Sequence, residues 1–345
     1  MTVHAADTRV VCLRRIAQRR RHLRRIQFAM GMEQRRSGRQ KCSKGGEKLI
    51  RISQLKLPIT HTKAQLEKKI AKTLKNPGNS FTYEIKKQSL DCRHKNDKIF
   101  VYTVDVTIRD EQKLAKKVNN NNIMLTKEKP YEFPSPGETP LLHSPVIVGS
   151  GPAGLFCGWY LAKAGYCPII LERGEEAEKR QKTVENFWKN GVLDPESNVQ
   201  FGEGGAGTFS DGKLNTLVKD PYGRNHEVLK RFVAAGAPEE IIYQQKPHLG
   251  TDVLVGIVEK MRHEIEEMGG KFCFRSKVTD LIFENNTLKE IEINNDKRIP
   301  AQVCVLAPGH SARDTFEMLQ KRGVYMEPKS FAVGLRIEHP QEMIN

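Results

Sequence analysis

The sequence predicts an α/β protein with a parallel sheet, preceded by a small α+β domain. Two apolar runs, at 146–148 and 169–171, flank a glycine-rich turn and a helical pattern, which together form a β-α-β unit. Residues 271–306 hold further strand patterns, at about 271–274, 277–283, 288–293 and 299–306, with Asn-Asn turns at 285–286 and 294–295. Ahead of both, residues 49–108 show a strand, a helix and two strands joined by a polar turn. We therefore expect one domain in front of a larger one.

The first 48 residues carry most of the net charge of +16. They hold 14 Lys+Arg and 3 Asp+Glu, whereas the other 297 residues hold 43 and 38. Three hypotheses fit this arginine-rich segment: an organelle presequence, an arm that binds nucleic acid or a membrane surface, or a stretch that is not natural polypeptide. We favour the third, because Lys44-Gly45-Gly46-Glu47 is what a translated ribosome-binding site would encode. The segment is then expected to be unstructured, with a natural start near Leu49.

Residues 49–110 are predicted to form the small α+β domain. Strands are expected at 49–57, 81–91 and 99–108, and a helix at 62–74. The pattern resembles a ferredoxin-like fold. The domain is rich in lysine, but no aromatic stacking motif accompanies the lysines, so nucleic acid is not the expected partner. Residues 111–144, with four asparagines and several prolines, are expected to be a linker.

The motif at 149–154, GSGPAG, indicates dinucleotide binding. Gly149 allows the tight turn, Gly151 has no Cβ to hold a pyrophosphate away, and Gly154 lets the helix lie close to the strand. The amide groups at the helix start favour a phosphate. Glu172, at the end of the second strand, is placed to accept hydrogen bonds from a ribose diol. A glycine-rich loop without a ligand is the alternative, and the full β-α-β context argues against it.

This segment resembles the FAD-binding motif of the glutathione-reductase-like flavoproteins, including Pro152-Ala153 and Glu172-Arg173-Gly174. The resemblance, and not the spacing, favours FAD over NAD and adds Pro152, Ala153 and Arg173 to the expected cofactor-binding residues. The seven cysteines form no CxxC pair. Their spacing argues against a structural zinc and against the dithiol disulfide reductases that share this motif, and it favours a reducing, cytoplasmic compartment.

A second glycine-rich stretch, GEGGAGTFSDGKL at 202–214, precedes KPHLGTD at 246–252. Together they resemble the uncharacterised bacterial FAD-dependent dehydrogenases of the large two-domain type. The resemblance implies that Gly204, Gly205 and Lys213 lie along the flavin, where a cation would stabilise the reduced ring. A solvated lysine is an equal alternative for Lys213.

The rest of the FAD-binding domain, 145–330, is expected to contain helices at 224–235 and 251–268 and an inserted β-meander. The resemblance places Val278 against the adenine and makes Ala307 and Gly309 a second nucleotide contact, which Pro308 weakens because it lacks an N–H. Ser311 and Asp314 are expected to cap a helix. No residue is assigned as catalytic, and no metal site is predicted.

The function predicted from these patterns is that of an FAD-dependent oxidoreductase of unknown substrate, with hydride transfer through the flavin. NAD(P)H is a candidate transient donor, because no second dinucleotide motif is visible. A flavin-associated RNA-binding or RNA-modifying protein and an inactive nucleotide-binding fragment are the alternatives. The resemblance also implies that 331–345 begins a truncated substrate domain. No run of about 18 apolar residues indicates a membrane span, and neither an oligomeric state nor a partner is predicted.

Overall fold

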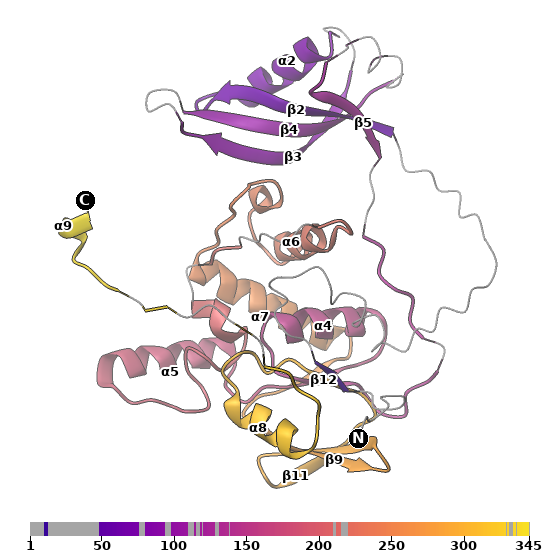
Figure 1. The fold of residues 1–345 in the computed structure, drawn as a ribbon, viewed down its shortest axis with the longest axis vertical. Helices are drawn as coiled ribbons and strands as arrows, with labels where there is room; N and C mark the ends of the chain where they lie inside the picture. Colours follow the sequence, from indigo (N-terminus) through magenta and orange to yellow (C-terminus); the bar gives the residue numbers. More distant parts are fainter. Residues whose placement is uncertain are drawn as a thin grey trace.

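The computed structural model describes residues 10–12, 48–75, 80–93, 98–109, 114, 118, 120–127, 131–137, 139–209, 212–214, 220–328, 330, 334–335 and 337–344. Within them the chain forms a parallel sheet, an antiparallel meander and a small antiparallel domain (Figure 1). Among these residues no helix combines the length and the apolar character that crossing a bilayer requires.

The parallel sheet is the centre of the larger domain, and its strand order is β1-β12-β6-β7-β8. All four of its strand pairs are parallel. Strands β6, β7 and β12 are short and apolar, as expected for strands buried on both faces. Their bounds are β6 Val146–Val148, β7 Ile169–Leu171, β8 Lys271–Cys273, β12 Cys304–Leu306 and β1 Val10–Cys12.

Strand β1 was not expected, because it belongs to the basic segment for which we predicted no structure. Val10 pairs with Cys304, and the register continues to Cys12 and Leu306. The physical reason is that the free edge of β12 offers unpaired N–H and C=O groups, which the apolar run Val10–Cys12 can satisfy. Apart from these three residues, the predictions for 1–47 lie outside the described residues.

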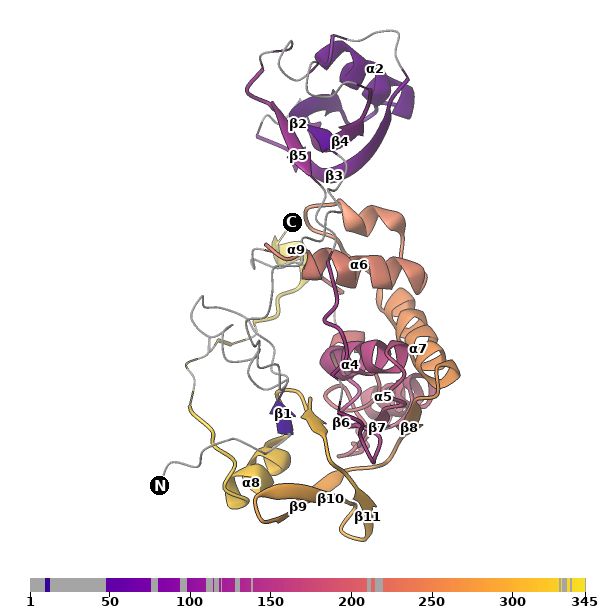
Figure 2. The same ribbon diagram turned by 90° about the vertical axis from the view of Figure 1, so that its right-hand side faces the viewer.

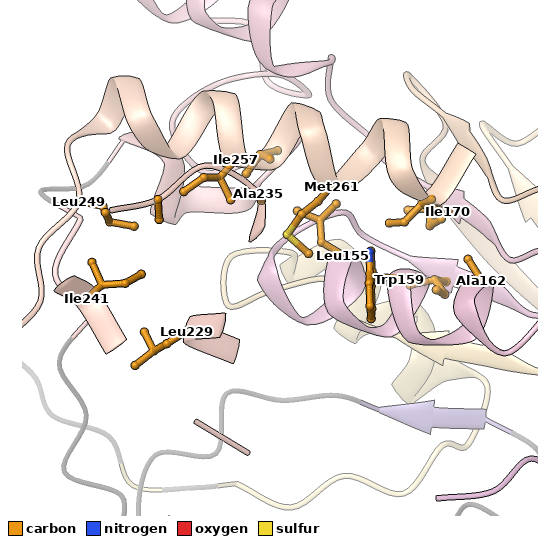
Figure 3. Close-up of a cluster of buried hydrophobic side chains, with 14 of the residues drawn as sticks. Leu155, Trp159, Ala162, Ile170, Leu229, Ala235, Ile241, Leu249, Ile257 and Met261 are labelled. Carbon is orange, nitrogen blue, oxygen red and sulfur yellow. The ribbon is translucent and has the colours of Figure 1, made fainter. Parts of the chain in front are cut away.

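One face of the sheet is covered by helices. Ile147, Ile170 and Val305 point to this face and pack in a cluster with α4, α6 and α7. Figure 3 shows Leu155 and Trp159 of α4 directed toward Met261 of α7. Because successive side chains of a strand alternate between faces, this cluster takes every second residue of each strand. The helices are α4 Pro152–Lys163, α5 Ala177–Asn190, α6 Arg224–Ala234 and α7 Thr251–Glu267.

The opposite face is covered by the meander and by helix α8. Val148, Leu171 and Leu306 pack there with Leu281 and Ile291 of the meander. The predicted strand 299–306 is in fact two strands, because the chain leaves the meander after Pro300 and enters the parallel sheet at Cys304. The elements of this layer are β9 Val278–Glu284, β10 Thr287–Ile293, β11 Lys297–Pro300 and α8 Arg313–Lys321.

The small domain has the strand order β3-β4-β2-β5, with every pair antiparallel. This order, with α2 between the first two strands, confirms the ferredoxin-like prediction. Strand β5, however, lies in the segment expected to be linker. Its residues pair with 48–52 because the outer edge of β2 would otherwise be unpaired. The bounds are β2 Lys48–Pro58, α2 Lys63–Thr73, β3 Thr82–Asp91, β4 Ile99–Thr107 and β5 Ile123–Lys127.

Helix α2 begins with a capping box. The Thr62 side chain accepts from the Gln65 N–H, and the Gln65 side chain accepts from the Thr62 N–H. Leu66, Ile70 and Leu74 are buried against the sheet, as the 3.6-residue period predicts. Ala64, in contrast, is exposed.

The small domain contacts the larger one through its edge strand β3. The Gln88 N–H donates to the Tyr243 carbonyl oxygen at 2.8 Å, and the Gln245 N–H donates to the Gln88 carbonyl oxygen at 3.0 Å. The Ser89 hydroxyl adds a bond of 2.6 Å to the Gln245 side chain. Figures 1 and 2 both show β3 as the strand of this domain nearest to α6. Residues 243–245 follow the short helix η2 (Glu239–Ile242), so the contact extends the small sheet by a β-bridge.

We expect Gln88→Pro to loosen this contact without unfolding the small domain. Proline removes the N–H that reaches Tyr243, and an outward N–H on an edge strand is where proline is tolerated. Hydrogen exchange at 243–245 should rise relative to the wild type. Gln88→Ala is the control, because it removes the side chain but keeps the N–H. Equal exchange in the two variants would contradict the expectation.

Candidate functional site

The turn Gly149–Gly151 lies where the order of the parallel strands reverses. From β6 the chain goes to β7 on one side, and it later returns as β12 on the other side. In open parallel sheets, ligands bind in the crevice outside the carboxyl ends of the strands at such a point. The residues that leave β6 and β12 here are Gly149 and Ala307. The topology therefore selects the same end of the sheet as the motif.

Two glycines of the turn are required by the protein itself. Gly149 has a φ of +97°, and a Cβ there would collide with the Ala307 carbonyl oxygen. A Cβ at Gly154 would collide with the Gly149 carbonyl oxygen. Gly151 differs, because the nearest atom to its Cβ position is the Gly205 Cα at 3.8 Å. The chain would therefore have room for a side-chain Cβ at Gly151, and its own packing does not require a glycine there.

The start of α4 faces this space. Gly151 is the N-cap residue and Pro152 is the first helical residue, where its missing N–H costs nothing. Pro152 and Ala153 are exposed. The first N–H groups of a helix have no partner within the helix and carry a partial positive charge, so they favour an anion.

Glu172 lies beside the turn, but its carboxylate does not face an open crevice. It is 4% exposed. Oε2 accepts from the Ser150 N–H at 2.9 Å and from the Ser150 hydroxyl at 2.7 Å. Oε1 accepts from the Gly174 N–H at 2.9 Å and from the Gly202 N–H at 3.1 Å. A carboxylate has about four acceptor positions, so a ribose hydroxyl would have to replace one of these donors. This corrects the expected geometry: Glu172 ties the two glycine-rich stretches together.

The second glycine-rich stretch packs on the first. The Gly204 N–H donates to the Ser150 carbonyl oxygen at 3.0 Å, and a Cβ on Gly205 would lie 3.1 Å from the Gly151 Cα. Both glycines have positive φ, +80° and +68°. The short helix η1, Gly205–Phe209, starts at this contact. The structure therefore brings Gly204 and Gly205 to the turn.

Arg180, which the sequence analysis did not single out, holds this loop in place. Its side chain is fully buried, and its guanidinium donates to the carbonyl oxygens of Asn198, Val199, Glu203 and Gly205 at 2.6–3.1 Å. Burial lowers the pKa of Arg180 to about 10, although the carboxylates of Glu172 and Glu203 act in the opposite direction. The sequence held one signal: Arg180 shares a helix face with the buried Ala177 and Val184.

Glu203 anchors the same loop from its other side. Its carboxylate accepts from the Ala177 N–H at 2.7 Å and from Arg262 Nε of α7 at 2.8 Å. Burial raises the pKa of Glu203, and the nearby Glu259 adds to the effect, whereas the hydrogen bonds from Ala177 and Arg262 lower it. The buried charges of Arg180, Glu172 and Glu203, together with the half-buried Arg262, thus form one network around the loop.

The Arg173 side chain is held by two acidic residues and an aromatic ring. Its guanidinium pairs with Glu196 at 2.7 Å and with both oxygens of Asp314 at 2.9 and 3.0 Å, and it lies over the Phe201 ring. Lys277 reaches the same two acids. Burial alone would raise the pKa of Asp314, but hydrogen bonds from Arg173 and Lys277 hold it well below its usual range. The predicted Ser311–Asp314 cap is wrong, since α8 has Ala312 as its N-cap residue.

The remaining predicted residues lie around this cluster. Val278 is buried at the start of β9, two residues after Ser276, whose N–H donates to the Glu172 carbonyl oxygen. Ala307 contacts the turn through its carbonyl oxygen, and Gly309 is exposed with a φ of +80°. Lys213 is exposed and forms an antiparallel bridge with His248, on a separate arm of the loop beside the start of α7.

No group of three or more His, Cys, Asp or Glu residues that could hold a metal ion occurs in the described part of the chain. A cavity of about 290 Å³ lies between the parallel sheet and the meander, lined by Leu171, Cys273 and Ile293 among others. It lies on the meander face and not at the turn. We assign it no role in the site.

Cys157, on the helix that starts at the turn, is expected to be unreactive. Burial raises its pKa to about 12, and the thiolate is the reactive form. Cys92 and Cys167 are exposed. Alkylation of the native protein at neutral pH, followed by peptide mapping, should label Cys157 at least about 100-fold more slowly than these two. Labelling after unfolding in urea is the control, and similar native rates would contradict the prediction.

Two family models match parts of the chain. A domain of unknown function (DUF8436) matches residues 49–107, which cover most of the small domain. An NAD(P)-binding Rossmann-like domain matches residues 147–182, which contain the turn, α4, β7 and Glu172. Together with the strand order, the second match confirms the predicted fold class, a Rossmann-like α/β domain with a parallel sheet.

A protein of Clostridium beijerinckii described as uncharacterised is 45% identical over 297 residues, which are 86% of this chain and 55% of that protein. The chain thus spans about half the length of this relative. Among solved structures, THI4 of Thermovibrio ammonificans aligns with a TM-score of 0.36 at 21% identity, over 53% of this chain and 63% of that one. L-proline dehydrogenase from P. horikoshii aligns with a TM-score of 0.30 at 18% identity, over 53% of this chain and 56% of that one. TM-scores this low carry no functional inference.

Proposed function

We propose that this chain forms the dinucleotide-binding part of an FAD-dependent oxidoreductase. The observation that carries the proposal is the space kept at Gly151. A glycine stands there although an alanine would fit the protein, and the position adjoins the start of α4 at the strand-order reversal. Packing within the chain does not require a glycine here, whereas the close approach of a pyrophosphate to the backbone does.

The residues present fit such a group. The N–H groups of Gly151 and Ala153 would bind the pyrophosphate, helped by the dipole of α4. Gly204 and Gly205 would cover it from the second loop, with Arg180 keeping that loop rigid. Val278, Ala307 and Gly309 would border the nucleotide, and Lys213 would lie toward the flavin. Glu172 would bind the ribose only by exchanging one of its four protein donors.

FAD, when bound, would supply hydride transfer, with a nicotinamide as donor in transient contact. The choice of FAD over NAD is supported by the resemblance of 145–174 and 202–214 to flavoprotein motifs. The Rossmann-like match supports a dinucleotide without distinguishing the two. The chain spans about half the length of this relative. We therefore propose the cofactor and the type of reaction, and assign no substrate.

The test is Gly151→Ala. The variant should unfold at the same urea concentration as the wild type, because the new Cβ meets no atom closer than 3.8 Å. Its affinity for FAD should fall at least about tenfold, which corresponds to ~1.4 kcal/mol. The visible flavin band after dialysis against FAD, and its bleaching by NADH or NADPH, are the measurements.

Gly256→Ala is the matched control, since this glycine of α7 also has open space at its Cβ position but lies away from the turn. It should bind FAD as the wild type does. A wild-type protein that stays colourless with added FAD, or a Gly151→Ala variant with unchanged affinity, would refute the proposal.

A further inference from the structure

The positive charge of the folded chain is concentrated in the small domain. Residues 49–109 hold 13 Lys+Arg and 5 Asp+Glu, a net charge of +8, whereas residues 110–345 hold 30 and 33, a net charge of −3. Such an asymmetry between two parts of one chain is typical of a domain that meets a polyanion. It concerns the domain whose matching family has no known function.

A groove of about 920 Å³ lies on this domain between α2 and the start of β3. Lys68 and Lys72 line it from positions i and i+4 of α2, so these two share a face, and Lys75 lines it just past the end of the helix. Ala64 and Ala71 keep the floor of the groove open.

The three lysines of the groove are available to a ligand. All three are exposed. Among the described residues none of them forms an ion pair, in contrast to Lys86, which pairs with Glu84 at 2.7 Å. Glu67 also lines the groove, but it interacts with the Tyr83 hydroxyl: burial, and then Glu67, raise the pKa of Tyr83.

Two aromatic rings complete the groove on its strand side. Phe81 and Tyr83 are half-buried, and their ring centroids are 6.3 Å apart. From the sequence alone, nucleic acid was not the expected partner, because no aromatic motif accompanied the lysines. The fold supplies what the linear pattern lacked, because it places residues 81 and 83 in the same groove as the lysines.

We propose that the groove between α2 and β3 binds single-stranded nucleic acid, with phosphates along Lys68, Lys72 and Lys75 and unpaired bases against Phe81 and Tyr83. A positively charged groove with aromatic side chains is the recurring arrangement for single strands. The phosphates of a duplex could bind the lysines, but its bases could not stack on the two rings, because they are already stacked on each other. This inference does not depend on the proposed flavin chemistry.

The test is fluorescence anisotropy of the full chain with a labelled oligouridine, over a series of salt concentrations. Lys68→Gln/Lys72→Gln should weaken binding about tenfold and reduce the salt slope by about 1.4, the value for two lost phosphate contacts to a single strand. Lys63→Gln/Lys69→Gln is the matched control, because it makes the same charge change on the same helix outside the groove. It should change affinity less than threefold.

Phe81→Leu/Tyr83→Leu should weaken oligouridine binding about tenfold and leave the binding of inorganic polyphosphate unchanged. Three results would overturn the proposal. They are an equal loss of oligouridine affinity in the two double-lysine variants, an unchanged oligouridine affinity in Phe81→Leu/Tyr83→Leu, and an RNA duplex that binds as tightly as oligouridine. If a variant is poorly folded by circular dichroism, photo-crosslinking of 4-thiouridine RNA to the wild type decides. Crosslinks within 64–83 support the groove, and crosslinks confined to 1–48 contradict it.

Discussion

Replacing Arg180 with methionine should lower the free energy of unfolding by about 3–5 kcal/mol, the cost typical of removing one partner from a buried charged network. The guanidinium is fully buried and donates to four carbonyl oxygens of the loop. Methionine fills the space but donates nothing, so these carbonyl groups lose their partners. The carboxylates of Glu172 and Glu203 also lose a nearby compensating charge.

Urea unfolding followed by circular dichroism measures this effect, and hydrogen exchange at 198–209 measures the loosening of the loop. Arg180→Lys keeps the charge but not the planar fork, and we expect an intermediate loss. Lys182→Met is the matched control on the same helix, because Lys182 is exposed. It should change stability by less than about 0.5 kcal/mol. A loss below about 1 kcal/mol for Arg180→Met would show that the network adds little.

The second large effect is expected for Gly154→Ala. Its Cβ would collide with the Gly149 carbonyl oxygen, which is backbone and cannot turn away as a side chain can. Helix α4 would have to move off the turn, with a destabilisation of about 1–3 kcal/mol or more. The amide groups at the helix start would then be misplaced, so FAD affinity should fall together with stability.

The contrast with Gly151→Ala makes this informative. Gly154→Ala should lower both the urea midpoint and the FAD affinity, whereas Gly151→Ala should lower the affinity alone. Gly256→Ala, in the middle of α7, should be neutral or stabilise the protein by about 0.5–1 kcal/mol, the difference in helix preference between glycine and alanine. A Gly154→Ala variant as stable as the wild type would contradict the close helix–strand packing.

The sequence was sufficient for elements whose signal is local. The motif at 149–154, helix α2 and the strands 146–148 and 169–171 follow from periodicity, glycine positions and apolar runs. The structure has both strands at the predicted bounds and α2 with bounds that differ by one residue. Local patterns failed at 299–306, where one run contributes to two sheets, and at 123–127, where a short strand is flanked by polar residues.

The identity of the turn follows from its own residues, because glycine permits the backbone angle at Gly149 and has no side chain at 151 and 154. What surrounds the turn depends on contacts made in folding: Glu172 accepts from Ser150, Gly174 and Gly202, Arg180 is buried beneath the second loop, and the rings of Phe81 and Tyr83 line the same groove as the lysines. Such contacts join residues far apart in the chain, and a carboxylate or guanidinium takes its role from the donors and acceptors that folding brings within hydrogen-bonding distance.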